Sequence, residues 1–128
     1  MGADQSMTQL AERVRTALET ADLDTFAELL APDVTWGAPG DVAPPCRNRN
    51  QVLDWYQKGR AAGVRALVVD ITTYPSKLLV ALALTSEGPP PADPIADRWQ
   101  VLTVADGRVR DIRGYDNESA ATTAAQAV

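Results

Sequence analysis

The sequence predicts a single α+β domain, because helical patterning dominates its first half and strand patterning its second. Apolar residues recur at helical spacing in three segments before residue 63. Between residues 65 and 115 the segments are rich in β-forming residues, and Asp106-Gly107, a typical hairpin turn, joins the last two. A chain of 128 residues is also near the usual size of one domain. We therefore expect one domain over residues 1–128, with its core at 7–117 and a loosely ordered, alanine-rich tail at 118–128.

The first half is expected to fold as two helices, a strand and a third helix. Asp22 is a suitable N-cap for the second helix, and Pro32 marks its end, because the residue before a proline disfavours helical backbone angles. The β-forming residues Val34, Thr35 and Trp36 then predict a short strand that runs into a proline-rich loop. The helices are expected at residues 6–21, 22–31 and 50–62, and the strand at 33–38.

The second half is expected to form two hairpins of one sheet. Residues 65–74 alternate between apolar and polar, which places Leu67 and Val69 on the same apolar side. Residues 78–84 are apolar on both faces, so we expect a central strand that is covered by helices on one face and by a partner subunit on the other. We therefore expect a homodimer.

Composition narrows the possible chemistry. The chain has no histidine and one cysteine, Cys46, which removes the commonest zinc ligand, the commonest general base and any internal disulfide. We expect no metal and no cofactor. The net charge of −5 argues against nucleic acid as a partner, and no apolar run approaches the roughly 20 residues that cross a bilayer. We expect a cytoplasmic protein that binds neither nucleic acid nor membrane.

Three local motifs complete the pattern: Asp33-Val34-Thr35-Trp36 at the first strand, Cys46-Arg47-Asn48-Arg49-Asn50-Gln51-Val52 at the third helix, and Asp106-Gly107-Arg108-Val109 with Gly114-Tyr115-Asp116 in the last hairpin. Together with the element order, they resemble the nuclear transport factor 2-like superfamily, and within it the SnoaL-like proteins, over residues 7–117. The resemblance implies a cone-shaped α+β barrel, in which a strongly bent antiparallel or mixed sheet wraps around three N-terminal-half helices and opens to a pocket. It does not select a reaction, since these proteins include isomerases, cyclases, epoxide hydrolases and non-catalytic binding modules.

Two chemistries of the family lack their carboxylates in this chain. The steroid isomerases carry a carboxylate just before a proline at the end of the first strand, where this sequence has Ala38. Asp41 is close enough to substitute for it, or is an ordinary solvated loop residue. The epoxide hydrolases use an arginine and two aspartates, and the resemblance places Arg98 at the arginine but Gln100 and Gly114 at the aspartates. A neutral glutamine cannot act as a base, so both reactions are disfavoured.

Polyketide cyclases of the SnoaL-like type instead favour one acidic residue in an apolar pocket. Asp116 is the candidate here, as acid or base, with Arg98 as the orienting residue. Strand alternation puts Arg98 on the same face as Gln100, and Asp116 on the same face as Gly114, so the two meet if both faces point inward. A structural ion pair between Arg98 and Asp116 on neighbouring strands is the open alternative.

The remaining candidates are side chains that suit an apolar or aromatic ligand. Cys46 is expected to be a packed residue and not a nucleophile, because no histidine can activate it. The expected function is a small-molecule pocket protein of SnoaL-like type that acts as an isomerase or cyclase on an apolar carbonyl compound. The alternative is a non-catalytic ligand-binding or dimerisation module of the same fold. The expected ligand-contacting residues are Trp36, Trp55, Tyr56, Gln100 and Tyr115.

Overall fold

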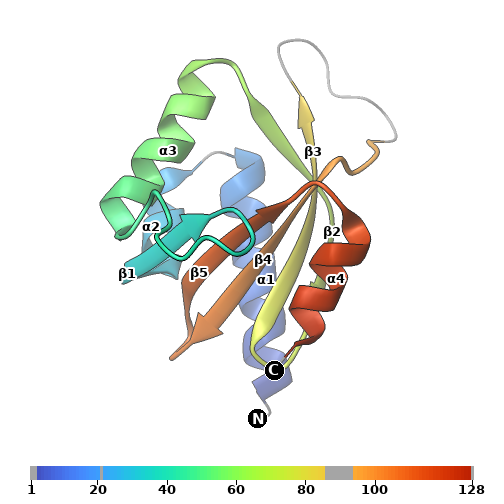
Figure 1. The fold of residues 1–128 in the computed structure, drawn as a ribbon. Helices are drawn as coiled ribbons and strands as arrows, with labels where there is room; N and C mark the ends of the chain where they lie inside the picture. Colours follow the sequence, from blue (N-terminus) through green and yellow to red (C-terminus); the bar gives the residue numbers. More distant parts are fainter. Residues whose placement is uncertain (1–2, 21, 86–93, 128) are drawn as a thin grey trace.

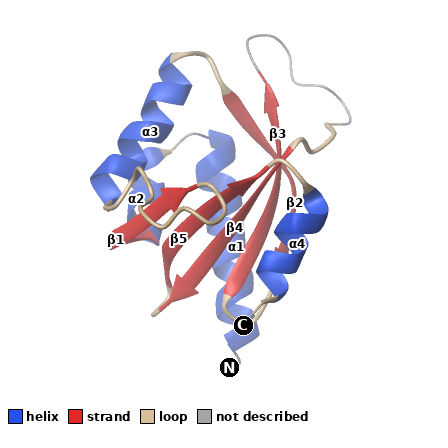
Figure 2. Cartoon of the chain, viewed as in Figure 1, coloured by secondary structure: helices blue, strands red, loops and turns tan. Residues whose placement is uncertain are grey.

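The elements follow the predicted order, with three helices in the first half and most of the sheet in the second (Figure 1, Figure 2). The computed structural model describes residues 3–20, 22–85 and 94–127. None of the helices described there is long and apolar enough to cross a membrane. The elements are α1 (Ala3–Thr20), α2 (Leu23–Leu29), β1 (Leu30–Gly37), α3 (Arg49–Ala61), β2 (Arg65–Thr73), β3 (Lys77–Thr85), β4 (Arg98–Ala105), β5 (Arg108–Tyr115) and α4 (Glu118–Gln126).

The five strands form one mixed sheet in the order β1-β5-β4-β3-β2. β1 runs parallel to β5, and the other neighbouring pairs are antiparallel. Asp106 and Gly107 join β4 to β5 with positive φ angles of 55° and 76°, which are the angles of the hairpin turn that this dipeptide favours. The predicted cone-shaped α+β fold is confirmed, with an open sheet that wraps around helices α1 to α3.

The main core lies between the sheet and the first three helices. α1 presents Met7, Leu10 and Val14 to this core, because residues three or four apart lie on one face of a helix. In Figure 1, α1 lies behind the sheet and α4 in front of it, so the two helices cover opposite faces. The largest fully buried side chains of this core include Phe26, Leu29, Leu30, Leu78, Leu102 and Ile112.

Residues 118–126 form a packed helix, which differs from the loosely ordered tail expected from the sequence. Asn117 caps α4, its side chain accepting a hydrogen bond from the backbone N–H three residues later at 2.9 Å. Ala121 and Ala125 lie one turn apart and are buried in a second cluster with Leu79 of β3. The short alanine side chains let α4 approach the sheet closely, so little apolar bulk suffices. α4 thereby covers part of the β3 face for which we expected a partner subunit.

A β-bulge changes which residues of β2 face the main core. Simple alternation predicts Leu67 and Val69 on the apolar side, but the pairing of β2 with β3 shifts between Val68 and Asp70. Val68 is buried and Val69 is 37% exposed. The extra residue reverses the alternation at this point, so the predicted inward face of the first half of β2 is wrong.

Candidate functional site

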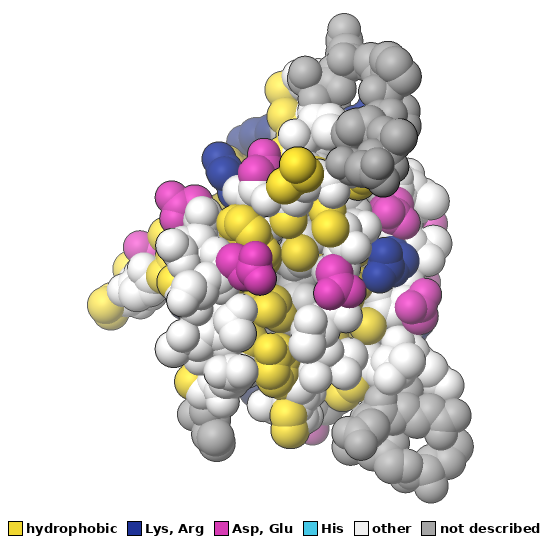
Figure 3. Space-filling view, turned by 90° about the vertical axis from the view of Figure 1, so that its right-hand side faces the viewer, with side chains coloured by type: hydrophobic (Ala, Val, Ile, Leu, Met, Phe, Trp, Pro, Cys, Tyr) yellow, Lys and Arg dark blue, Asp and Glu magenta, His cyan; other side chains and the backbone are white. Residues whose placement is uncertain are grey.

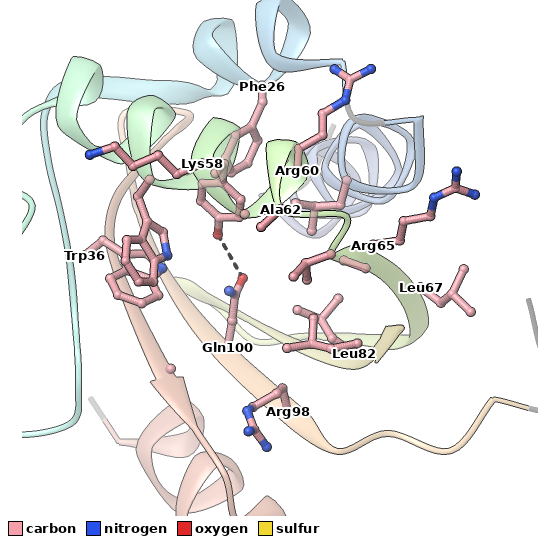
Figure 4. A pocket seen from close by; sticks show the side chains of 18 of the residues that line it. Phe26, Trp36, Lys58, Arg60, Ala62, Arg65, Leu67, Leu82, Arg98 and Gln100 are labelled. Carbon is pink, nitrogen blue, oxygen red and sulfur yellow. Dashed lines mark hydrogen bonds between the residues drawn. The ribbon is translucent and has the colours of Figure 1, made fainter. Parts of the chain in front are cut away.

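A cavity of about 1590 Å³ opens near the turn between α3 and β2 (Figure 4). Its walls come from the C-terminal end of α1, from α3, from residues 38–45 and from the ends of β3, β4 and β5. The volume exceeds the roughly 300–1,000 Å³ of a typical small-molecule site, so it can accept a ligand of that size. The apolar wall residues Phe26 and Leu82 were not singled out by the sequence. All seven predicted site residues border the cavity: Trp36, Trp55, Tyr56, Arg98, Gln100, Tyr115 and Asp116. The Tyr115 side chain, however, packs in the second cluster with Leu79, on the other face of the sheet from Gln100.

Tyr56 and Gln100 form a polar contact on the inner wall, as the dashed line in Figure 4 marks. The Tyr56 hydroxyl donates a hydrogen bond to Gln100 Oε1 at 3.3 Å, which links α3 to β4. The Phe26 ring packs against Tyr56 with its edge, at a centroid distance of 5.1 Å and an interplanar angle of 78°. Burial raises the pKa of Tyr56 to about 12. The phenol is therefore neutral at physiological pH and remains a donor.

The Trp36 indole brings a second donor to the same wall. Its Nε1 atom is buried and has no hydrogen-bond partner among the described residues. The indole lies close enough to the Tyr56 hydroxyl to lower the pKa of that group slightly, but without the geometry of a hydrogen bond. On its other side, Trp36 packs against Trp55, with ring centroids 5.0 Å apart. A buried N–H without an acceptor costs free energy, which a ligand oxygen at this place would recover.

Local backbone contacts explain why these aromatic side chains reach the cavity. Trp36 on β1 exchanges two backbone hydrogen bonds with Cys46, at 3.0 and 3.3 Å, which folds the intervening loop back on the strand. The Asn48 side chain caps α3 by accepting from Gln51 N at 2.9 Å, and the Gln51 side chain accepts from Arg47 N at 2.8 Å. These two hydrogen bonds start α3 beside β1, so that Trp55 and Tyr56 of the next turns border the cavity.

Arg113 of β5 holds residues 38–45, which form one side of the cavity. Its Nη1 donates to the carbonyl oxygens of Ala38 and Asp41, both at 3.0 Å. Its Nε donates to both carboxylate oxygens of Asp111 at 3.1 Å. The Asp41 carboxylate accepts a hydrogen bond from Ala38 N at 2.8 Å. Asp41, considered from the sequence as a substitute base, therefore closes a turn of this loop.

Arg98 and Asp116 lie at the exposed rim. Gln100 pairs with Gly114 across β4 and β5, which places Arg98 and Asp116 two residues further toward solvent on the cavity side. Both side chains are exposed, and Arg98 Nη1 donates to the carbonyl oxygen of Asp97 at 2.8 Å. None of the ion pairs between described residues joins Arg98 to Asp116. The structural ion pair that was the open alternative is thus not formed within the described ranges.

Cys46 packs against α3 as expected. It is buried, and its Sγ donates to the carbonyl oxygen of Gln51 at 3.6 Å. Burial raises the pKa of Cys46, and the Asp54 carboxylate raises it further. A thiol held in its protonated form is a poor nucleophile.

The family model described as a SnoaL-like domain matches residues 11–112. No curated protein sequence matches the chain significantly.

Solved structures share the fold. Bal32a, from a soil-derived mobile gene cassette, is 16% identical, has a TM-score of 0.72, and is matched over 94% of this chain and 96% of that one. A suggested polyketide cyclase from Sinorhizobium meliloti is 22% identical, with a TM-score of 0.64 and coverage of 86% and 98%. An LEH-like epoxide hydrolase of M. tuberculosis is 18% identical, with a TM-score of 0.63 and coverage of 93% and 88%. These identities establish the fold alone, whereas the family model spans most of the chain. The chain therefore belongs to the SnoaL-like domain family, with the nuclear transport factor 2-like fold that its sequence resembles.

Proposed function

We propose that this protein binds a small, largely apolar carbonyl compound in the cavity. The observation that carries the proposal is the buried Trp36 Nε1–H on the inner wall, for which the described residues provide no acceptor. Gln100, whose Oε1 accepts from Tyr56, brings its Nε2–H as a second donor. A carbonyl oxygen satisfies these donors, while the rest of the ligand contacts the apolar walls at Phe26 and Leu82. Because Tyr56 donates to Gln100 Oε1, the amide keeps Nε2 available to the ligand.

We infer further that the bound compound is isomerised or cyclised. The Asp116 carboxylate removes a proton from the carbon next to the carbonyl, and the charge that develops on the carbonyl oxygen is stabilised by the two donors. Return of the proton to another carbon completes an isomerisation, and attack of the carbanion on a second carbonyl completes a ring closure. Asp116 follows Tyr115, the last residue of β5, so its Cα atom is at most about 7 Å from that of Gly114, the partner of Gln100, a spacing that suits a small substrate between base and donors. Arg98 orients the substrate at the rim.

Binding is tested by calorimetry with aryl alkyl ketones such as valerophenone. Trp36→Phe keeps an aromatic ring but removes the N–H, so we expect affinity to fall by about two- to tenfold, the effect of one hydrogen bond. Tyr74→Phe is the matched control, since Tyr74 packs in the cluster under α4 and away from the cavity. Equal affinity of Trp36→Phe and wild type would show that the indole N–H does not bind the ligand.

Catalysis is tested by Asp116→Asn, with product formation followed by nuclear magnetic resonance for any ketone that binds. Removal of a general acid or base lowers turnover by about 10²–10⁴-fold. Binding should persist, because Asp116 is exposed at the rim. Undiminished turnover in Asp116→Asn would contradict the role of this residue.

Binding without turnover is the second candidate function, and the exposure of the carboxylates favours it. The acids that border the cavity are Glu19, Asp41 and Asp116, and all three are exposed. An exposed carboxylate is not held by its surroundings against a bound ligand, as a general base must be. Ketones that bind to the wild type but are never converted would support this candidate.

A further inference from the structure

The cavity continues beyond the polar wall that meets the carbonyl oxygen. Its volume of about 1590 Å³ exceeds the roughly 300–1,000 Å³ of a typical small-molecule site. Figure 4 places Ala62 and Leu82, which both border the cavity, on the side of Gln100 away from Trp36. The space on this side can hold a part of the ligand other than the carbonyl group.

The inner face of the sheet forms the floor of this continuation. Gln100 pairs with Val80 of β3. Four residues further along β3, Leu84 pairs with Ala66 of β2. Strand alternation puts Leu82 and Leu84 on the same face as Val80, which belongs to the main core. On a flat sheet, Ala66 would lie about 13 Å along β3 and about 10 Å across it from Gln100. The floor is thus long enough for an extended chain that starts near Gln100.

The opposite wall comes from α1 and from the turn between α3 and β2. The residues that border the cavity there are small or apolar: Leu18, Ala62, Gly63 and Val64. Leu18 is partly buried against the main core, like Ala66 of the floor. Little side-chain volume enters the cavity from Ala62 and Gly63. None of these side chains can form a hydrogen bond, so a ligand would be held between them by apolar contact.

Large apolar side chains are left exposed in this part of the cavity. Leu84 is 40% exposed and Val64 is 43% exposed, and both border the cavity. Exposed apolar side chains that gather at one opening are typical of a ligand-binding groove. Arg65 pairs with Thr85, and alternation puts both on the opposite face of the sheet from Leu84. The floor beside Leu84 is therefore apolar.

We propose that the ketone bound in this cavity carries an extended alkyl chain, which lies over Leu84 and Ala66 while its carbonyl oxygen meets Trp36. The inference rests on the proposed function and names the substrate class as long-chain ketones. The chain covers Leu84 and Val64, and removal of this apolar surface from water strengthens binding.

The test compares three methyl ketones by calorimetry: 2-pentanone, 2-octanone and 2-undecanone. Each burial of a methylene group strengthens binding about three- to fourfold when it is complete. Because the walls are partly open to solvent, we expect 2-undecanone to bind about tenfold more tightly than 2-octanone. Ala66→Phe fills the end of the floor with a ring, so it should remove most of this preference. The affinity for 2-pentanone, whose chain is too short to reach Ala66, should stay unchanged.

Leu84→Gln is a second variant, because an exposed position tolerates a polar side chain without loss of the fold. It should lower the preference for 2-undecanone to about threefold, since the chain then lies partly over an amide. Val69→Gln is the matched control. Val69 is exposed to a similar extent, 37%, but does not border the cavity, so this variant should keep the full preference.

The outcomes separate the chain from the carbonyl group. Equal affinity of the wild type for 2-octanone and 2-undecanone would overturn the inference of an extended chain and leave the binding of ketones intact. A preference that survives in full in both Ala66→Phe and Leu84→Gln would overturn the placement of the chain over these residues. Failure of all three ketones to bind would contradict the proposed function as well.

Discussion

The Tyr56 hydroxyl controls how the inner wall of the cavity presents Gln100. Its hydrogen bond occupies Gln100 Oε1 and leaves the amide nitrogen for a ligand. Because burial raises the pKa of Tyr56 to about 12, this donor stays protonated far above neutral pH. The polar contact in the cavity is therefore insensitive to pH over the range in which most proteins work.

Tyr56 also gives a pH-dependent contribution to stability. A phenol whose pKa is raised on folding stabilises the fold below its unfolded pKa of about 10, and this contribution is lost as pH rises toward 12. Between about pH 10 and pH 12, we expect the free energy of unfolding of the wild type to fall further than that of Tyr56→Phe. The difference should be on the order of 2 kcal/mol. Chemical denaturation at several alkaline pH values measures this, with Tyr74→Phe as the control. Parallel pH profiles for wild type and Tyr56→Phe would show that Tyr56 is not held in its neutral form.

At the scale of elements, Arg113 connects β5 to the loop that follows β1. Its guanidinium group contacts Asp111 on its own strand and two carbonyl oxygens of residues 38–45. Thr35 of β1 also donates a hydrogen bond to Asp111. The cavity rim is thus held by side chains of the sheet and not by contacts within the loop alone. Gly37 allows this close approach, because a Cβ atom there would lie 2.9 Å from the Asp41 carboxylate.

Replacement of Arg113 should loosen this rim. In Arg113→Met three partners lose their hydrogen bonds, and we expect a loss of about 1–2 kcal/mol in the free energy of unfolding, with weaker ketone binding. Arg110→Met is the matched control, since Arg110 lies on the same strand but its ion pair with Asp33 is exposed. That pair should contribute less than about 1 kcal/mol. Equal effects of the two substitutions on ketone affinity would show that Arg113 does not position the loop.

At the scale of the whole molecule, α4 decides which apolar surface is left for a second subunit. The face toward the viewer in Figure 3, on the side of the molecule where α4 lies, shows a band of hydrophobic side chains with acidic side chains on either side. Leu79 and Val101 of the outer sheet face are buried under α4, and Trp99 and Tyr115 beside them are partly buried. The homodimer stays a prediction, and its interface must leave α4 in place.

Detachment of α4 should destabilise the chain and change its association. Ala121→Asp places a carboxylate at a position that is 0% exposed, so we expect a loss of about 2 kcal/mol in the free energy of unfolding. Ala120→Asp is the control, because Ala120 is exposed in the first turn of the same helix. Sedimentation at micromolar concentration gives the mass of each protein. A single-chain mass for the wild type would contradict the homodimer, and equal stability of the two variants would contradict the packing of α4.

The sequence by itself determined the class of fold, because local rules carried the information. Asp22 caps α2, and Asp106-Gly107 turns between β4 and β5, as predicted. Helical and strand periodicity depends on residues a few positions apart, which the chain displays directly. Strand alternation and the family resemblance also predicted that Gln100 and the aromatic residues line the cavity.

Only the tertiary structure decided the features that depend on contacts between distant segments. The bulge at Val69 reversed the face of β2, and α4 covered a surface that the sequence had left to a partner. The hydrogen bond between Tyr56 and Gln100 joins residues 44 positions apart. The register of the strands and the docking of the helices depend on the free energy of the whole chain. A single bulge, or an alanine helix that packs closely, can therefore change which residues are buried, against the local hydrophobic pattern. For the same reason, periodicity places Arg98 and Asp116 on a face but cannot say that they remain exposed and unpaired with each other.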